Sequence, residues 1–137
     1  MNTFRLRIVT PYGVVFDGDA EELVVRTTSG DTGILAGHIN YVAPLGMGRA
    51  TVVANGKTRY GACIGGMVSV VNGTVTLVPT TFEWADQIDI DRAKASQSRA
   101  EGILVDKTST DTDILLAKAR LKRALVRTSV AKENKYR

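Results

Sequence analysis

The spacing of apolar residues changes near residue 85, and this change strongly constrains the fold of the chain. From Phe4 to Val78, apolar residues alternate with polar ones or form short runs rich in Val, Thr and Ile, which is typical of β-strands. From Gln87 to Val105, and again from Asp111 to Ala131, the chain is rich in Ala, Arg, Lys and Ile and contains no proline, as helices do. We therefore expect a strand-rich unit followed by two helices.

Turn sequences separate the expected strands. Asn55-Gly56 and Asn72-Gly73 are typical of tight antiparallel hairpins, and we also expect turns at Pro11-Tyr12-Gly13 and at Asp17-Gly18-Asp19. Many short strands predict a sandwich or a barrel. A polar break at Thr108-Ser109-Thr110 separates the two helices, so that they form a hairpin.

The sequence thus predicts an α+β chain with two domains. An antiparallel β-sandwich of about ten short strands is expected over residues 1–85, and an antiparallel two-helix hairpin over residues 86–137. Small and apolar residues recur at helical spacing on each helix and should form the seam between them. On the first helix they are Ala93, Ser96, Ala100, Ile103 and Leu104, and on the second Ile114, Ala117, Leu121, Ala124, Leu125 and Thr128.

Composition narrows the chemistry that is open to the chain. With 137 residues, of which 44% are hydrophobic and 23% charged, it has the composition of an ordinary globular protein with a real core. No apolar run approaches the roughly 20 residues of a membrane span, and the N-terminus lacks the apolar stretch of a signal peptide. The one cysteine, Cys63, lies among small and apolar residues, which indicates a buried strand position.

The net positive charge of the chain comes entirely from its C-terminal third. Residues 1–87 hold 6 Lys and Arg against 7 Asp and Glu, whereas residues 88–137 hold 12 against 7. This distribution favours an acidic partner for the helices. The alternative is a basic nucleic-acid-binding module or another β-sandwich adaptor module, although among the basic residues only Tyr136 offers a ring for base stacking.

Five stretches together resemble the epsilon subunit of bacterial F-type ATP synthases over essentially the whole chain. They are FRLRIVTP, FDGDAEELVV, SGDTGILAGHINYVAPL, IDIDRA and LKRALVRTSVA. The resemblance implies a ten-stranded β-sandwich followed by two helices. It also implies a non-catalytic subunit on the cytoplasmic face of the cell membrane, peripheral to it, that couples proton-driven rotation to ATP synthesis and inhibits ATP hydrolysis. No cofactor is required, and ATP is expected as a regulatory ligand.

The resemblance also names partners for the two domains. The sandwich is expected to contact the gamma subunit of the central stalk and the ring of c subunits, and the extended helices to reach the catalytic alpha and beta subunits. Nucleic acid is not among the expected partners, and the membrane is met only through the complex. Inhibitory contacts with the catalytic subunits are expected from the basic residues Lys118, Arg120, Lys122, Arg123 and Arg127.

The segment SGDTGILAGHINYVAPL, residues 29–45, would lie at the end of the sandwich that meets the ring. Gly30, Gly33 and Gly37 are expected in tight turns, with φ values that glycine favours. The expected ring contacts are Gly33, Ile34, His38 and Asn40. Strand alternation alone instead favours the core for Ile34 and Leu35. A single histidine without a second ligand favours a polar contact over a metal site.

Ile88-Asp89-Ile90-Asp91-Arg92-Ala93 contains I-D-x-x-R-A, which resembles the ATP-binding motif of the family. Helical spacing puts Asp89, Arg92 and Arg99 in one angular sector, and guanidinium groups suit phosphate oxygens. The expected ATP contacts are Glu83, Ile88, Asp89, Arg92, Ala93, Arg99, Arg123 and Arg127. Helix capping by the aspartates and ion pairing by the arginines is the alternative. Phe82 and Trp84 fall in the expected linker, close to Glu83. A nucleotide-hydrolysing loop, G-x-x-x-x-G-K-[ST], does not occur in the sequence.

Overall fold

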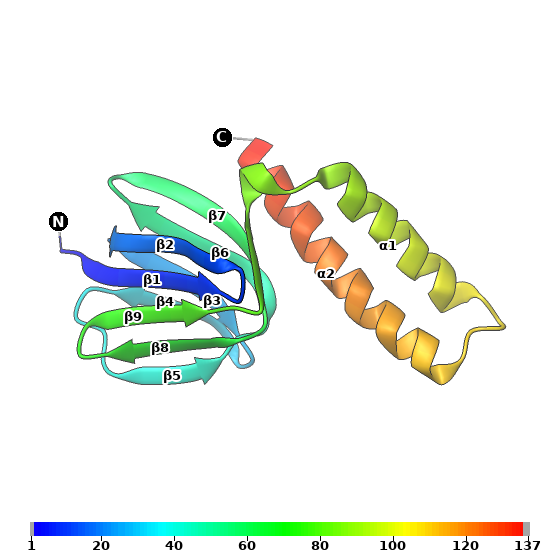
Figure 1. Cartoon of the computed structure of the whole chain (residues 1–137), viewed down its shortest axis with the longest axis horizontal. Helices are drawn as coiled ribbons and strands as arrows, with labels where there is room; N and C mark the ends of the chain where they lie inside the picture. The colour runs from blue at the N-terminus through cyan, green and yellow to red at the C-terminus, as the bar shows by residue number, and fades with distance from the viewer. Residues whose placement is uncertain (1, 136–137) are drawn as a thin grey trace. The chain divides into compact units, whose positions relative to one another are not determined.

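The computed structural model describes residues 2–135 of the chain and divides them into two units, at Trp84 and Ala85. Tyr136 and Arg137, counted above with the basic segment, lie outside these residues. The first unit holds ten strands, and a 3₁₀ turn and two helices follow in the second (Figure 1). The elements are β1 (Phe4–Thr10), β2 (Gly13–Ala20), β3 (Glu22–Thr27), β4 (Gly30–Leu35), β5 (Tyr41–Pro44), β6 (Met47–Ala54), β7 (Lys57–Ile64), β8 (Met67–Val71), β9 (Thr74–Val78), β10 (Thr81–Trp84), η1 (Ala85–Gln87), α1 (Ile90–Val105) and α2 (Asp111–Lys135).

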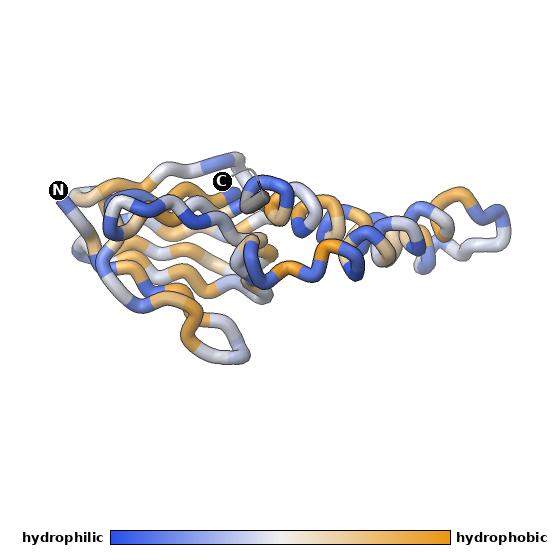
Figure 2. Tube along the Cα trace, turned by 90° about the horizontal axis from the view of Figure 1, so that it is seen from above, coloured by the Kyte–Doolittle hydropathy of each residue, from blue (hydrophilic) through white to orange (hydrophobic). Residues whose placement is uncertain are grey.

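The strands form two five-stranded sheets, which confirms the predicted sandwich. One sheet has the order β2-β1-β9-β8-β5 and the other β10-β7-β6-β3-β4. Neighbouring strands are antiparallel, except that β1 pairs with β9 in parallel. Burial alternates along strands such as β1 and β3, so every second residue points between the sheets. Apolar and polar residues both occur along the strands of the sandwich (Figure 2).

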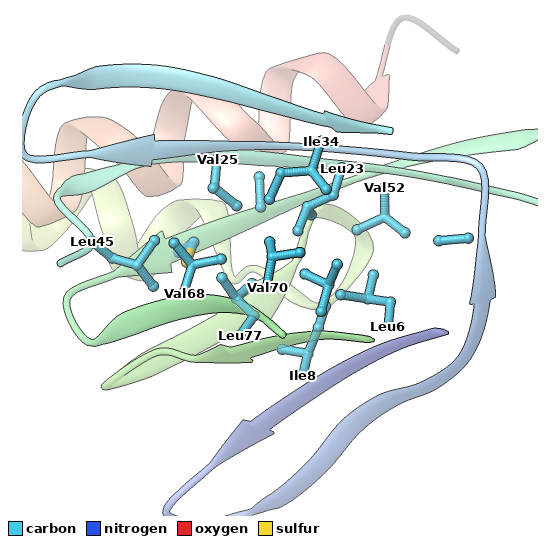
Figure 3. Packing of buried hydrophobic residues seen from close by; sticks show 14 of the residues in the cluster. Leu6, Ile8, Leu23, Val25, Ile34, Leu45, Val52, Val68, Val70 and Leu77 are labelled. Atoms are coloured by element: carbon cyan, nitrogen blue, oxygen red, sulfur yellow. The ribbon is translucent and has the colours of Figure 1, made fainter. Parts of the chain in front are cut away.

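A single apolar core fills the space between the two sheets. Side chains from both sheets meet there, and their exposed fractions are close to zero (Figure 3). Those labelled in Figure 3 are Leu6, Ile8, Leu23, Val25, Ile34, Leu45, Val52, Val68, Val70 and Leu77. Cys63 belongs to the same cluster, and burial raises the pKa of its thiol to about 12. The predicted buried strand position of Cys63 is therefore confirmed.

Both Asn-Gly pairs make the tight hairpins that the sequence predicts. Asn55 and Gly56 have φ values of 55° and 71°, and Asn72 and Gly73 have 48° and 82°. Positive φ at both central residues defines a type I′ turn, whose twist matches that of the flanking strands. The Asp17-Gly18-Asp19 prediction is wrong, because this stretch lies inside β2. Its main chain pairs with β1, and Arg5 donates to Asp17 Oδ1 at 2.6 Å.

The predicted linker around Glu83 is also different in the structure. Residues 81–84 form β10, which pairs with β7 along one edge of its sheet. The rings of Phe82 and Trp84 meet edge to face at 4.9 Å, and the guanidinium of Arg59 lies 3.7 Å from the centre of the Trp84 ring. Because side chains alternate along a strand, Glu83 points to the opposite face of the sheet from these two aromatic rings.

Gly66, between β7 and β8, has a backbone that admits no side chain. Its φ is 95°, and a Cβ atom there would lie against the Val78 carbonyl and 2.7 Å from Cα of Pro79. Its carbonyl accepts a hydrogen bond from the backbone of Leu45 at 2.8 Å. Gly66 therefore lets the β7–β8 connection lie in close contact with the chain at Val78 and Pro79.

We predict that Gly66→Ala lowers the free energy of unfolding of the sandwich by about 2 to 3 kcal/mol, from backbone strain and overpacking. Urea denaturation followed by the fluorescence of Trp84, the one tryptophan of the chain, measures the effect. Gly33→Ala is the control, since a Cβ atom at Gly33 meets nothing within 4 Å. Equal midpoints for the two variants would contradict the prediction.

Candidate functional site

Residues 29–45 carry the chain from one sheet of the sandwich to the other. They include β4 and β5, which are edge strands of different sheets, and the connection between them over residues 36–40. Gly30 and Gly37 have φ values of 118° and 82°, so the prediction of glycine-specific turns is confirmed at both. The same prediction is wrong for Gly33, which lies inside β4 outside the positive-φ region and pairs with Val24.

The apolar residues of this segment divide between core and surface. Ile34 is fully buried in the sandwich core, so its predicted role in surface contact is wrong, and the alternative prediction from strand alternation is correct. Leu35, which follows it on β4, points outward and is 59% exposed, so the core prediction is wrong for this residue. Ile39 and Val42 are exposed as well, at 77% and 62%. This segment therefore presents apolar surface at Leu35, Ile39 and Val42.

The two polar residues predicted to contact the ring hold the connection in place. The Nδ1 atom of His38 lies 2.7 Å from the carbonyl oxygen of Ile39, and its ring meets the edge of Tyr41 at 5.8 Å. Asn40 accepts a hydrogen bond through Oδ1 from the backbone of Asn72, at 2.8 Å. His38 is half-buried and Asn40 is exposed. The connection is thereby fastened to the β8–β9 turn of the other sheet.

In the second unit, α1 and α2 pack through small side chains, as the sequence predicts. Residues at the expected spacing are buried on both helices, namely Ala93, Ala100, Ala117, Ala124 and Thr128. The Thr128 hydroxyl donates to the Ala124 carbonyl at 2.9 Å, so it leaves no unsatisfied group. Leu125 was expected in this seam but is 47% exposed, because its position lies about 80° around α2 from Ala117.

Asp89 caps the first helix. Its Oδ1 atom accepts a hydrogen bond from the backbone nitrogen of Arg92 at 3.0 Å, which is the N-cap arrangement. The carboxylate therefore has the capping role that the sequence offered as the alternative to nucleotide binding. Arg92 is exposed on the first turn of α1, Ile88 is half-buried, and Ala93 is buried in the seam.

A cavity of about 400 Å³ opens between α1 and α2. Four arginines from the two helices line it, together with small and apolar residues of α1. The lining residues are Ser96, Arg99, Ala100, Ile103, Arg120, Arg123 and Arg127. The structure thus brings Arg99, Arg123 and Arg127 together, as expected for a phosphate site. Arg92 lies seven residues before Arg99, about 10 Å along the helix, and is not among the lining residues.

Arg120 is the lining residue that sequence reasoning did not place in this cavity. The sequence assigned it to the inhibitory surface, together with Lys118 and Lys122, which are exposed on α2. Arg120, Arg123 and Arg127 stand at positions i, i+3 and i+7, so they fall in one angular sector of α2. This spacing is visible in the sequence and was the pattern that could have revealed Arg120.

Local hydrogen bonds order the connection between the helices. Thr108 donates to Asp106 Oδ1 from its backbone nitrogen at 2.9 Å and its hydroxyl at 2.8 Å, and these bonds hold the Asp106 pKa below its ordinary value. Thr110 and Asp113 form a capping box at the start of α2, with reciprocal bonds of 3.1 and 3.0 Å. These bonds set where α2 begins and therefore where its arginines face.

Each of the two units matches a known protein-family model. Residues 3–85 match the family model for the beta-sandwich domain of the ATP synthase delta/epsilon chain, and residues 86–132 match the model for its long alpha-helix domain. The chain belongs to the ATP synthase delta/epsilon family. The two matched ranges together cover nearly the whole chain and meet next to the division between the two units.

Curated bacterial members of the family resemble the chain over its length. It is 43% identical to the ATP synthase epsilon chain of Ruminococcus albus, over 96% of this chain and 98% of that one. It is 45% identical to the epsilon chain of Bacillus velezensis, with the same shares. The predicted resemblance to epsilon subunits is confirmed.

A solved structure of the Euglena gracilis mitochondrial ATP synthase, containing OSCP, F1 and the c-ring, includes a similar fold. The TM-score is 0.81 at 18% identity, with coverage of 98% of this chain and 82% of that one. At this identity the likeness shows the fold alone. Within residues 2–135 of this epsilon-family chain, no helix has the length and hydropathy of a membrane span.

We predict that Thr110→Ala destabilises the helical hairpin by about 1 kcal/mol, because it removes the cap of α2. Thermal unfolding followed by far-UV circular dichroism at 222 nm reports on the helices. Thr112→Ala, at an exposed position in the same turn, is the control. Asp113→Ala combined with Thr110→Ala should cost less than the sum of the two single changes, whereas strict additivity would show that the capping box is not formed.

Proposed function

We propose that the helical hairpin of this epsilon-family chain is an ATP sensor that regulates ATP hydrolysis. The broader role follows from the family: the chain is a central-stalk subunit of F-type ATP synthase. The observation that supports the sensor is the cavity lined by Arg99, Arg123 and Arg127, three arginines expected to bind ATP.

The arginine cavity suits the triphosphate of a nucleotide. Guanidinium groups bind phosphate oxygens through paired hydrogen bonds and keep their charge at any physiological pH. The volume of about 400 Å³ lies within the range of small-molecule sites. The contacts predicted at Glu83, Ile88, Asp89, Arg92 and Ala93 remain predictions, with the capping bond of Asp89 as a competing role for that carboxylate.

Both helices supply walls of the cavity, so only the folded hairpin contains it. A ligand that binds one state of a two-state protein shifts the population toward that state. ATP at 100 times its dissociation constant would favour the folded hairpin by about 2.7 kcal/mol, if the extended form does not bind it. Alanines bury little area in the seam, so a shift of this size is enough to control the hairpin.

When the hairpin opens, α2 carries its basic residues to a new environment. We infer that Lys118, Arg120, Lys122, Arg123 and Arg127 then contact acidic residues of the catalytic alpha and beta subunits and block rotation in the hydrolysis direction. Arg120, Arg123 and Arg127 line the cavity in the folded state, so ATP and the catalytic subunits would compete for the same three side chains. This competition makes the two states mutually exclusive.

The sandwich supplies the attachment to the rotor. The exposed Leu35, Ile39 and Val42, beside His38 and Asn40, offer an apolar surface with polar groups for the ring of c subunits. We infer that the gamma subunit contacts the sandwich as well, and that the chain is held at the cytoplasmic face of the cell membrane through these partners. The chain is proposed to act without catalysing a reaction itself; its one cysteine is a buried thiol with a raised pKa, unsuited to nucleophilic attack.

We predict that the purified full chain binds ATP with one-to-one stoichiometry in isothermal titration calorimetry. Arg123→Ala and Arg99→Ala should each weaken binding by about tenfold or more, because each removes charged hydrogen bonds to phosphate. Lys122→Ala, which removes an exposed charge next to Arg123, is the matched control. ATP affinity unchanged in both arginine variants would contradict the phosphate site, and Arg92→Ala tests the I-D-x-x-R-A segment separately.

We predict that deleting residues 88–137 raises ATP hydrolysis by the assembled enzyme, because the inhibitory helices are gone. Hydrolysis rates of membranes containing the intact and truncated subunit measure the effect, and retained ATP synthesis confirms assembly. The double variant Lys118→Ala, Lys122→Ala should relieve inhibition while leaving ATP affinity unchanged, since neither lysine lines the cavity. Equal hydrolysis with and without the helices would exclude inhibition by this segment.

A further inference from the structure

The cavity between α1 and α2 is lined by one arginine that the ATP contacts predicted from the sequence do not include. Arg120 joins Arg99, Arg123 and Arg127 in its wall, so four guanidinium groups surround one space. Among the described residues that line it, none is a carboxylate, and Ser96 alone has an uncharged polar side chain. The lining of the cavity is therefore strongly basic, which favours an anionic ligand.

Arg120 is not needed to hold the helices together. It is exposed, whereas the seam is made by the buried Ala117, Ala124 and Thr128 on the same helix. α2 begins at Asp111, after the interhelical connection. Arg120 is therefore the cavity-lining arginine of α2 that lies nearest to this connection. Arg127 lies seven residues further along, so the guanidinium-bearing positions on α2 span about 10 Å along the helix axis.

This arrangement matches a chain of phosphate groups better than a nucleoside. Arginine forks bind phosphate oxygens in pairs, and arginines distributed along 10 Å can engage successive phosphates of one chain. Recognition of adenine needs acceptors for its amino group, and the lining offers only the hydroxyl oxygen of Ser96. The phosphates, and not the base, carry the interactions available in this cavity.

We propose that the cavity recognises an inorganic polyphosphate chain without a nucleoside, and that Arg120 determines selectivity for the number of phosphates. The proposal rests on the proposed function only in using the same cavity, and it extends the ligand class from ATP to pyrophosphate and tripolyphosphate. Arg120 binds the phosphate nearest the interhelical connection. Ligands with fewer phosphates leave it without a partner, so they bind more weakly.

The test uses the purified full chain and calorimetry in buffer of fixed salt without divalent cations. The ligands are tripolyphosphate, pyrophosphate, phosphate, AMP and ATP. We expect affinity to fall by about tenfold or more from tripolyphosphate to pyrophosphate and again to phosphate, and tripolyphosphate to displace ATP. AMP should bind no better than phosphate.

Arg120→Ala should lower the affinity for tripolyphosphate by about tenfold and reduce the preference for tripolyphosphate over pyrophosphate. Lys118→Ala and Lys122→Ala remove the same charge from exposed positions of α2 outside the cavity and should change affinity by less than about threefold. Circular dichroism checks that the helices are retained, which alanine at an exposed helical position favours. Arg120→Gln, which keeps the length of the side chain, provides a second variant.

The outcomes separate this inference from the ATP sensor. If ATP binds but tripolyphosphate does not displace it, the inference is overturned and the sensor stands. If tripolyphosphate binds with dependence on Arg120 and ATP does not, the inference stands and the sensor fails. Equal losses in Arg120→Ala and Lys122→Ala would show general attraction to a basic helix and overturn the inference. Absence of binding by any ligand overturns both.

Discussion

The close packing of α1 against α2 through alanine determines what the second unit can do. Ala93, Ala100, Ala117 and Ala124 are almost completely buried, and their small side chains let the helices approach. Longer residues beside the seam therefore meet across a narrow gap, and at Arg99, Arg120, Arg123 and Arg127 they enclose a cavity. The same small side chains bury little apolar area. The interaction that forms the cavity thus contributes little apolar burial to the stability of the hairpin, which suits the opening proposed above.

The sandwich, in contrast, is held in one conformation by extensive packing. Apolar side chains from both sheets fill one core, type I′ turns set the register of two hairpins, and Gly66 allows two connections to touch. Each of these features opposes rearrangement. The division between Trp84 and Ala85 separates this tightly packed sandwich from the helical unit, to which the proposed regulation is assigned.

Much of the fold could be predicted because local patterns and tertiary packing agree along most of the chain. The failures have physical causes. The sequence Asp17-Gly18-Asp19 is typical of a turn. In the structure it is part of a strand, because its backbone pairs with β1 and Asp17 forms an ion pair with Arg5. Residues 81–84 are too few to show the alternating pattern of a strand. They form β10 only because their backbone pairs with β7, which is distant in sequence. Such long-range pairing is not visible in a local window.

The candidate site was predictable in part, for a similar reason. Helical spacing places Arg99, Arg123 and Arg127 on facing stripes, but a stripe does not show where a cavity begins and ends. Arg92 lies on the same stripe as Arg99 and is not among the lining residues, whereas Arg120 lines the cavity. For Ile34 and Leu35, the sequence could not show which of the two points inward until the pairing of β4 with β3 set the register.

The ordered connection between the helices has a consequence for the speed of the response. Asp106, Thr108, Thr110 and Asp113 make their hydrogen bonds over a few residues, and the two helices they join are neighbours in sequence. Structures built from such local contacts form quickly, and isolated helices and short loops form within about a microsecond. In the proposed sensing cycle, closure of the hairpin would therefore be fast compared with the milliseconds of a typical catalytic turnover. The pace at which the subunit changes state would be set by its ligand and its partners.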